Sequence, residues 1–242
     1  MKKKIVAIVI LIAGVCVCLF SGYKIFVINR EYDISEKFYS QQAEKCIKTE
    51  EKSSINKSNE KTVDFDKLKK INADICGWID IPAITVSYPI LQGENNDAYL
   101  HHLPDGTYNF CGSIFIDERC KNDFSSPVTV IYGHCMKDGS MFAKLGRFLD
   151  KSLIKNNGTF KIYTPDKTIT AKILNCFEIS KNSEIYNLPK NKLSEDYIKN
   201  FYSETGTDLS KINTNTYNLV LLSTCSFSFE SARTVLVAVI PK

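Results

Sequence analysis

The first thirty residues combine a basic end with one long apolar run. Residues 5–23 are 19 consecutive uncharged positions, mostly aliphatic. At about 1.5 Å per helical residue, such a run reaches close to the roughly 30 Å of a bilayer core. Three lysines at 2–4 precede the run, which favours a cytoplasmic N-terminus and export of the remainder. We expect a cytoplasmic basic tail over 1–4 and a transmembrane signal-anchor over 5–28. The alternative is a cleaved secretory signal, although no clear small-x-small cleavage site follows the run.

Residues 29–62 are polar and contain neither Gly nor Pro. Phe38 and Tyr39, flanked by acids and lysines, allow some helix here, whereas the stretch 48–62 has a single strongly apolar residue, Ile55. A stretch with so little apolar surface cannot bury a core. We expect 29–62 to be a polar stalk that links the anchor to a folded domain over 63–242.

Beyond residue 63, short runs of β-branched and aromatic residues alternate with turn signals, which is the pattern of strands. Runs such as 128–132 and 219–222 are apolar at nearly every position, as in strands that are covered on both faces. Three other stretches, 65–75, 140–149 and 193–202, space their apolar residues as helices do. The predicted strands are 78–86, 112–117, 127–132, 159–163, 168–179, 217–224 and 234–240. This pattern predicts a mostly β fold, a closed or nearly closed barrel with a few peripheral helices.

The charge distribution excludes a nucleic-acid binder. The 242 residues have ordinary globular composition and a net charge of +4. Residues 1–30 hold five basic side chains and no acid, so the remaining 212 residues carry 26 basic and 27 acidic side chains, a net charge of −1. A nucleic-acid binder needs its basic excess on the folded part of the chain. We therefore expect no nucleic-acid partner.

Nine cysteines, an odd number, occur without a repeated spacing and without a Cys-x-x-Cys pair. With three histidines in the chain, no zinc-binding pattern appears, and we expect no metal. An exported chain favours disulfides, but the spacing predicts none in particular, so most of these cysteines are interpreted as small buried apolar residues. Cys225 is the exception because of its position.

Cys225 ends an apolar strand, and a seven-residue segment, 226–232, separates it from Arg233 at the start of the next one. Antiparallel pairing of these strands would set Arg233 opposite Cys225. A thiol is mostly protonated near neutral pH, and a neighbouring cation favours the nucleophilic thiolate. Arginine also donates hydrogen bonds to a developing oxyanion. The arrangement predicts a cysteine nucleophile with an arginine partner.

His134 follows another apolar strand, and Gly133 before it permits a sharp turn. A cysteine nucleophile needs an acid or base of near-neutral pKa, which histidine supplies. Each of the three residues alone has an ordinary structural explanation, but a Cys, a His and an Arg at the edges of three core strands is a rare coincidence. His101 and His102 lie in a polar loop before Pro104, and we expect them on the surface.

At these residues the chain resembles the class B sortases. The resemblance runs from about residue 78 to the C-terminus and centres on Leu222-Ser-Thr-Cys225, on Arg233 and on Tyr132-Gly-His134. Supporting motifs are Gly77-Trp-Ile-Asp-Ile-Pro82, Tyr88-Pro-Ile-Leu-Gln92, the stretch 96–100, Gly112-Ser-Ile-Phe-Ile-Asp117 and Asp138-Gly-Ser-Met-Phe-Ala-Lys-Leu145. The combination is highly specific, although each piece alone is weak. Cys135 departs from the pattern, which has Asn after the Gly-His pair, and puts a second oxidisable thiol beside the site.

The resemblance implies an eight-stranded sortase-type β-barrel with a few peripheral helices, preceded by a transmembrane helix, with the stretch 193–202 as an extra helix before the cysteine strand. It also implies a transpeptidase located outside the membrane, which anchors surface proteins to the cell wall. Cys225 would attack a Thr carbonyl in the C-terminal sorting signal of a secreted protein. His134 would act as acid and then as base, while Arg233 and the Ser226 backbone N–H stabilise the oxyanion. A peptidoglycan amine would accept the acyl group, and no metal or organic cofactor is required.

The class B positions near the sorting peptide are matched by five further residues, Asn96, Leu100, Tyr132, Ser223 and Thr224. For Leu100 and Tyr132, core packing explains the residue equally well. Two other functions stay open: a different Cys–His peptidase or transpeptidase of cell-wall peptides, and a membrane-tethered sortase-like binding module without turnover. A pilin-polymerising class is disfavoured because the apolar run 235–240 is too short to span a membrane.

Overall fold

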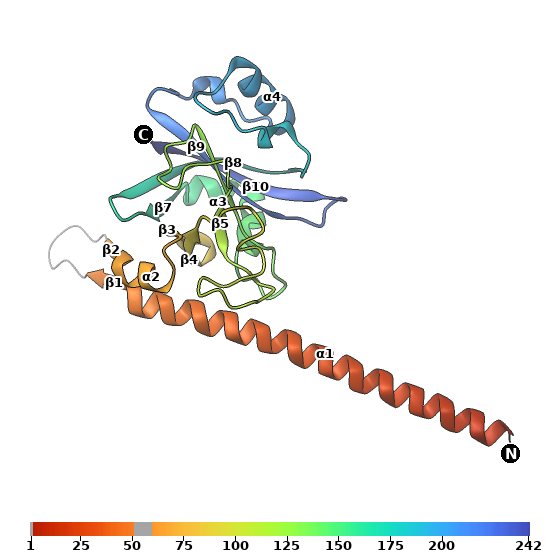
Figure 1. The fold of residues 1–242 in the computed structure, drawn as a ribbon. Coiled ribbons are helices and arrows are strands. Elements are labelled where there is room, and N and C mark those ends of the chain that lie inside the picture. Colours follow the sequence, from red (N-terminus) through yellow and green to blue (C-terminus); the bar gives the residue numbers. More distant parts are fainter. Residues whose placement is uncertain (1, 51–59) are drawn as a thin grey trace. The chain divides into compact units, whose positions relative to one another are not determined.

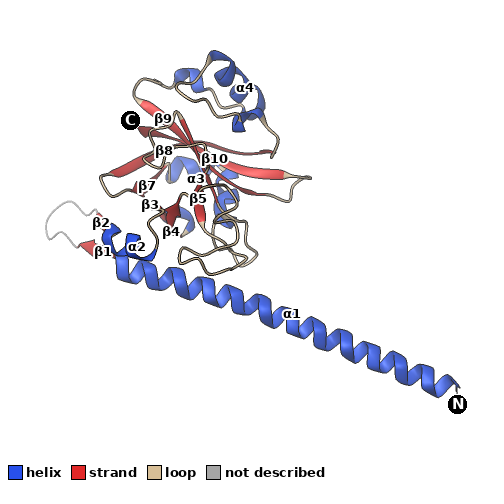
Figure 2. Ribbon diagram, viewed as in Figure 1, coloured by secondary structure: helices blue, strands red, loops and turns tan. Residues whose placement is uncertain are grey.

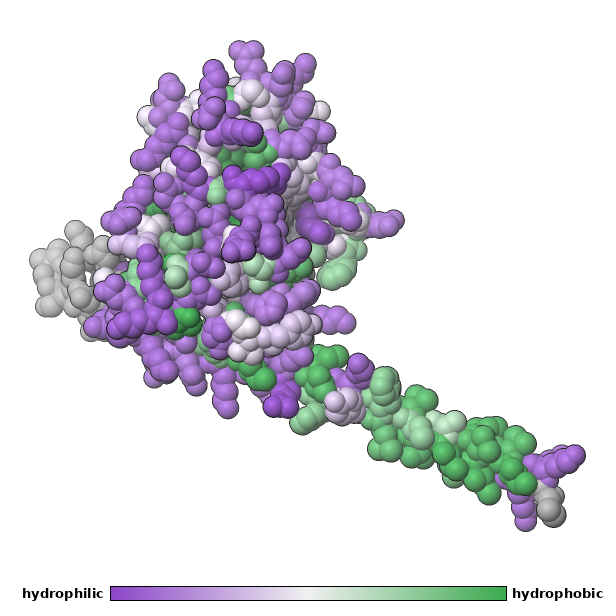
Figure 3. Space-filling view, in the orientation of Figure 1, coloured by the Kyte–Doolittle hydropathy of each residue, from purple (hydrophilic) through white to green (hydrophobic). Residues whose placement is uncertain are grey.

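The computed structural model describes residues 2–50 and 60–242, and the chain divides into two compact units, Met1–Ser40 and Gln41–Lys242 (Figure 1). Helix α1 (Lys2–Cys46) runs through the whole of the described part of the first unit. It contains the expected anchor and is long and apolar enough to cross a membrane; in the described residues no other helix is. The apolar side chains of residues 5–26 are exposed, and Figure 3 shows this part of the helix in green.

The second unit begins inside the segment that we expected to be a stalk. After α1, strand β1 (Ile47–Glu50) pairs antiparallel with β2 (Glu60–Val63). The middle of the expected stalk, 51–59, lies outside the described residues. Cys46 is buried and packs in one cluster with Leu68 of helix α2 (Phe65–Ile71) and with the barrel residue Trp78. The two segments that flank 51–59 therefore belong to the barrel unit.

Eight strands close a barrel, which confirms the predicted fold. Their order around the barrel is β10-β8-β7-β3-β4-β5-β6-β9, with parallel pairs at β4–β5 and β6–β9 and antiparallel pairs elsewhere. The bounds are β3 Ile75–Ile81, β4 Val86–Leu91, β5 Ile114–Ile116, β6 Val128–Tyr132, β7 Thr159–Tyr163, β8 Thr168–Ser180, β9 Tyr217–Cys225 and β10 Ala232–Pro241.

The prediction of one strand over 78–86 was wrong. The chain reverses there through a short 3₁₀ turn, η1 (Pro82–Ile84), so that β3 and β4 pair with each other. Pro82 fixes φ and has no N–H for the sheet, and Thr85 completes the reversal with φ of 55°. Antiparallel pairing of β3 with β4 puts the two apolar runs side by side, which a single strand cannot do.

Each of the three stretches predicted to be helical contains a helix, but one of these is a 3₁₀ helix. Helix α2 stops at Ile71 instead of 75 because β3 begins shortly after it. The stretch 140–149 forms a 3₁₀ helix, η2 (Ala143–Leu149), followed by helix α3 (Lys151–Asn156). Helix α4 (Glu195–Thr205) lies where an extra helix was expected. The Ser194 hydroxyl caps its first turn by accepting from Tyr197 N, and Gly206 ends it with φ of 67°.

The segment between β8 and β9, residues 181–216, covers one face of the sheet formed by β6, β8, β9 and β10. It contains the short 3₁₀ turns η3 (Glu184–Tyr186) and η4 (Leu209–Lys211) on either side of α4. Phe201 of α4 and Ile185 of η3 pack with strand residues such as Leu221 and Val237 in one buried cluster. Figure 2 shows α4 in blue beside these red strands. This layer brings Tyr186 to the end of the sheet where the predicted site residues lie.

Candidate functional site

Strands β9 and β10 form the antiparallel hairpin that the sequence predicts, and Cys225 is the direct partner of Arg233 in the register. Side chains of directly opposed residues lie on the same face of a sheet, with Cβ atoms about 4.5–5.5 Å apart. Both residues are half-buried at the open end of the hairpin. The Arg233 guanidinium is steadied by donating from Nη1 to the carbonyl oxygen of Ala232 at 3.0 Å. A thiol and a guanidinium therefore share one edge of the barrel.

His134 reaches the same edge from β6, which runs parallel to β9 with Tyr132 opposite Ser223. The next residue, Gly133, donates its backbone N–H to Ser223 O at 3.2 Å. A Cβ at Gly133 would lie 2.4 Å from Ile114 Cδ1 and 2.8 Å from the Phe142 ring, so a larger residue would force these side chains to move. This close passage sets the backbone of His134 beside the end of β9.

The imidazole of His134 is held between two neighbouring residues. Its Nε2 lies 2.7 Å from Leu100 O, and the His101 ring stacks on it with centroids 5.4 Å apart and planes 19° apart. A carbonyl oxygen only accepts, so Nε2 carries the proton in this bond and the neutral ring has its lone pair on Nδ1. Burial lowers the pKa of His134, the bond to Leu100 opposes this change, and His101 lowers the pKa further.

His101 is exposed, as predicted, and His102 is partly buried, with Nδ1 3.1 Å from Ala98 O. The stacking of His101 on the candidate acid–base residue was not predicted. The two rings come from chain segments 33 residues apart, so only the fold brings them together. One signal in the sequence could have indicated this contact: His101 directly follows Leu100, which the sequence analysis already assigns to the site.

A pocket of about 250 Å³ opens between these residues. It brings together all three candidate catalytic side chains and all the candidate substrate contacts except Ser226. Its walls are Asn96, Asp97, Leu100, Phe115, Tyr132, Gly133, His134, Ser223, Thr224, Cys225 and Arg233. The hydroxyl of Thr224 is buried and has no hydrogen-bond partner in the described part of the chain; in β9 the side chain of Thr224 alternates to the face opposite that of Cys225.

Ser226 does not take the place expected of it. Its backbone N–H, expected to be a second oxyanion donor, donates to Ala232 O at 3.0 Å, and its hydroxyl donates to the carboxylate of Glu178. The backbone N–H therefore closes the mouth of the β9–β10 hairpin, the hydroxyl binds to β8, and Ser226 does not line the pocket. In this conformation Arg233 is the donor at the thiol edge.

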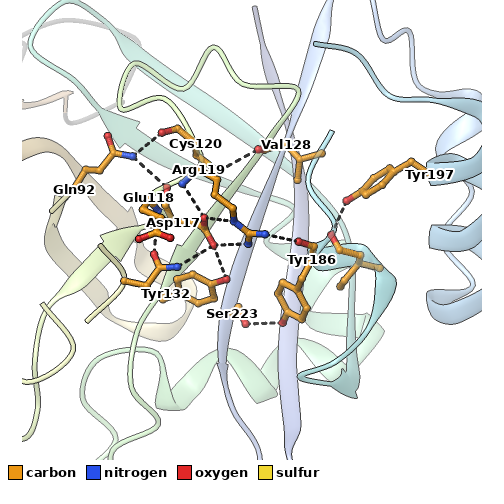
Figure 4. Close-up of polar contacts among 12 residues, drawn as sticks. Gln92, Asp117, Glu118, Arg119, Cys120, Val128, Tyr132, Tyr186, Tyr197 and Ser223 are labelled. Atoms are coloured by element: carbon orange, nitrogen blue, oxygen red, sulfur yellow. Dashed lines mark hydrogen bonds and ion pairs between the residues drawn. The ribbon is translucent and has the colours of Figure 1, made fainter. Parts of the chain in front are cut away.

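Behind the pocket lies a buried polar network that sequence reasoning missed (Figure 4). Asp117, fully buried at the end of β5, accepts from Nε and Nη2 of Arg119 at 2.8 Å each and from the Tyr132 hydroxyl at 2.9 Å. Burial raises the pKa of Asp117, but the hydrogen bonds from Arg119 and Tyr132 outweigh it and hold the pKa below its usual range. Burial and the Asp117 charge raise the pKa of Tyr132. Tyr132 is therefore a neutral donor fixed in one orientation.

The network continues to the layer that covers the sheet. Arg119 donates from Nη1 to Tyr186 O at 3.1 Å, and the Tyr186 hydroxyl lies 2.8 Å from Ser223 Oγ. Asn96 joins the other side, accepting from Glu118 N at 3.0 Å. Asp117 and Arg119 were visible in the sequence as an Asp-x-Arg at a strand end, but nothing local pointed to Tyr186, 67 residues further on.

The cysteines other than Cys225 differ in their burial. Cys46, Cys111, Cys120 and Cys176 are buried, in keeping with their interpretation as small apolar residues. Cys135 is partly buried next to His134, where its backbone bridges to Met141. Burial raises the pKa of Cys135, and a negative charge on Cys225 raises it further. The second thiol is therefore close enough to Cys225 to sense its charge, and it is predominantly protonated near neutral pH.

Comparison with known proteins agrees with this geometry. The sortase domain model matches residues 79–240. A sortase B of Listeria monocytogenes is 31% identical over 226 residues, which cover 91% of this chain and 90% of the relative. The structure of a Bacillus anthracis sortase B superposes with a TM-score of 0.70 at 25% identity, over 89% of this chain and all of that one. A Staphylococcus aureus sortase B–substrate complex gives a TM-score of 0.63 at 26% identity, over 73% of this chain and 84% of that one.

The closed barrel with a Cys, a His and an Arg at one edge defines a sortase-type transpeptidase. The chain belongs to the sortase family. Within that family, the sortase B proteins that match most of its length assign it to class B.

Proposed function

We propose that this protein is a membrane-anchored cysteine transpeptidase that cleaves a C-terminal sorting signal after Thr. It joins the acyl product to a peptidoglycan amine and thereby anchors surface proteins to the cell wall. The observation that carries the proposal is that Cys225, His134 and Arg233 line one and the same pocket. Each of the three comes from the end of a different barrel strand, so the barrel holds them rigidly and leaves them accessible.

In the first half of the reaction, the Cys225 sulfur attacks the Thr carbonyl carbon and forms a thioester. The C–N bond to the next residue breaks, and protonated His134 gives its proton to the leaving nitrogen. In the second half, neutral His134 takes a proton from the incoming amine, which attacks the thioester and releases the Cys225 thiolate. Because Nε2 is bonded to Leu100 O, Nδ1 is the nitrogen that exchanges this proton.

The lowered pKa of His134 suits both halves of this cycle. Its leading cause, burial, disfavours the imidazolium, so the protonated ring is a stronger acid towards the leaving amine. Arg233 is the proposed donor to the oxyanion and to the substrate backbone. Asn96, Leu100, Tyr132, Ser223 and Thr224 are the proposed contacts to the sorting peptide. All five line the pocket that contains Cys225.

The proposed location follows from α1. Residues 5–28 would cross the cell membrane once with residues 1–4 in the cytoplasm, and the domain from about residue 63 would act outside, next to its cell-wall acceptor. Secreted proteins with a C-terminal sorting motif would be the clients.

The test uses the full-length protein in detergent micelles with quenched peptides that carry Asn-Pro-x-Thr, Leu-Pro-x-Thr or Pro-Pro-x-Thr cores. We expect the wild type and Cys135→Ala to cleave one of these cores after Thr, and we expect no cleavage by Cys225→Ala. Mass spectrometry should find a thioester adduct on the peptide that contains residue 225. Equal cleavage by Cys225→Ala, or no cleavage together with a Cys225 that does not react with a thiol probe, would contradict the proposal and favour a binding module.

A further inference from the structure

A second cavity, also of about 250 Å³, adjoins the candidate catalytic pocket. Tyr132 and Arg233 line both cavities, so the two cavities are adjacent. The remaining walls of the second cavity are Arg119, Lys181 and Tyr186. Three of its five walls are therefore cations, and none is an acid. The nearest carboxylate to Arg119, that of Asp117, lies buried beneath and balances one of the three charges.

The cationic side chains of this cavity keep free donors. An arginine has five N–H groups, and Arg119 uses three of them for Asp117 and Tyr186 O, which fixes the guanidinium and leaves two N–H groups. Lys181 follows β8 and is anchored by its backbone N–H, which donates to Ser231 O at 2.9 Å. Its ammonium group and the Arg233 guanidinium make no ion pair within the described residues, so two positive charges remain uncompensated.

Both tyrosine hydroxyls of the cavity are already engaged, Tyr132 with Asp117 and Tyr186 with Ser223. The open groups of the cavity are thus cationic N–H donors, and the ligand group that they fit best is a carboxylate. The cavity does not include His134, the residue beside which an acceptor amine has to be deprotonated. It adjoins the pocket at Arg233, the direct neighbour of Cys225.

We propose that the cavity formed by Arg119, Lys181 and Arg233 is a carboxylate subsite of the substrate groove, which selects sorting signals with an acidic side chain on the N-terminal side of the Thr. The proposal rests on the proposed function and names the substrate class of the same site. A carboxylate on the amine acceptor has the same chemistry, but its amine has to reach His134, which lies outside the cavity. The position of the cavity therefore favours the sorting peptide as the source.

The test starts from the peptide core that the wild type cleaves and compares Glu with Gln at two positions. One pair of peptides differs at the position before Thr, and the other pair differs at the position before Pro. We expect kcat/KM for Glu to exceed that for Gln by about threefold to tenfold at one of these positions. The preference should shrink as NaCl is raised, because salt screens the interaction. A second comparison tests whether the carboxylate comes from the amine acceptor instead. It uses triglycine and triglycinamide as acceptors, which share the reacting amine and differ in the terminal carboxylate.

Lys181→Gln should reduce the Glu-to-Gln ratio to about twofold or less. Lys172→Gln removes an exposed lysine from the same strand region without touching the cavity and should leave the ratio at its wild-type value. Because the ratio is taken within one protein, a general loss of activity in a variant does not affect it.

The outcomes separate this proposal from the function on which it rests. A Glu preference that depends on Lys181 supports the subsite on the peptide side, and a triglycine preference that depends on Lys181 supports the carboxylate subsite but moves its ligand to the acceptor. Cys225-dependent cleavage with equal rates in both pairs overturns the subsite and leaves the transpeptidase intact. The absence of Cys225-dependent cleavage of every peptide overturns both.

Discussion

Replacing the buried Asp117 by Asn tests whether the network behind the pocket holds the barrel edge together. The carboxylate accepts two hydrogen bonds from the Arg119 guanidinium and one from Tyr132, all at 2.8–2.9 Å. Asparagine has the same shape but no charge. Its amide NH2 group replaces one carboxylate oxygen, so that an N–H donor would face the donors of Arg119 and Tyr132. Hydrogen bonds to a charged group contribute about 1.5–3 kcal/mol. Since the Arg119 side chain is 49% exposed and keeps much of its hydration, we expect a loss of about 2–3 kcal/mol in the free energy of unfolding.

The barrel carries its own probe for this measurement. The chain has one tryptophan, Trp78, which is fully buried in the barrel core. Its fluorescence should follow unfolding in detergent micelles, and a loss of this size should lower Tm by about 4–12 °C for a domain of this length. Asp166→Asn, at an exposed carboxylate with no hydrogen bond among those of the described residues, is the matched control and should change Tm by less than 2 °C.

The pH dependence gives the sharper check. The pKa of Asp117 is depressed in the folded protein, so its contribution to stability is fully present above the unfolded pKa of about 4 and is lost as pH falls through the folded pKa. The difference in Tm between the wild type and Asp117→Asn should therefore be constant from pH 7 to about pH 5 and disappear in stronger acid. An equal Tm at pH 7, or a difference that is undiminished in acid, would refute the electrostatic account.

Three further changes test the site directly. Gly133→Ala puts a Cβ 2.4 Å from Ile114 Cδ1 and should destabilise the barrel by about 1–3 kcal/mol; an unchanged urea midpoint by Trp78 fluorescence would show that the passage is not tight. His101→Gln removes the third and smallest of the effects on the His134 pKa, which lowers that pKa. The His134 pKa should therefore rise, and the acid limb of the pH profile of kcat/KM should move to higher pH. An acid limb at the wild-type pH would contradict coupling of the two rings. Arg233→Lys keeps the charge but loses the guanidinium fork, and we expect kcat/KM to fall about tenfold or more with Tm unchanged. Wild-type turnover in that variant would leave Arg233 a purely structural role.

The predicted strands were right where a run of apolar residues coincides with one strand, as in β6, β9 and β10. A core strand between two covered faces leaves a continuous apolar signature in the sequence, so the ends of these strands, and with them His134, Cys225 and Arg233, were found from local patterns. The prediction failed at 78–86, where the apolar pattern continues through the turn η1 and the chain reverses inside it.

The sequence by itself determined which apolar runs form the three core strands, where those strands end, and which chemically active side chains stand at those ends. These are local properties of hydropathy and residue type. The tertiary structure alone decided how those ends meet, because the parallel pairing of β6 with β9 and the closure of the barrel join segments about ninety residues apart. It also set His101 against His134, engaged the Ser226 N–H with Ala232, and brought Arg119 and Lys181 to one cationic cavity. The physical reason is that register and long-range hydrogen bonding depend on the packing of the whole core, and no local pattern encodes that packing.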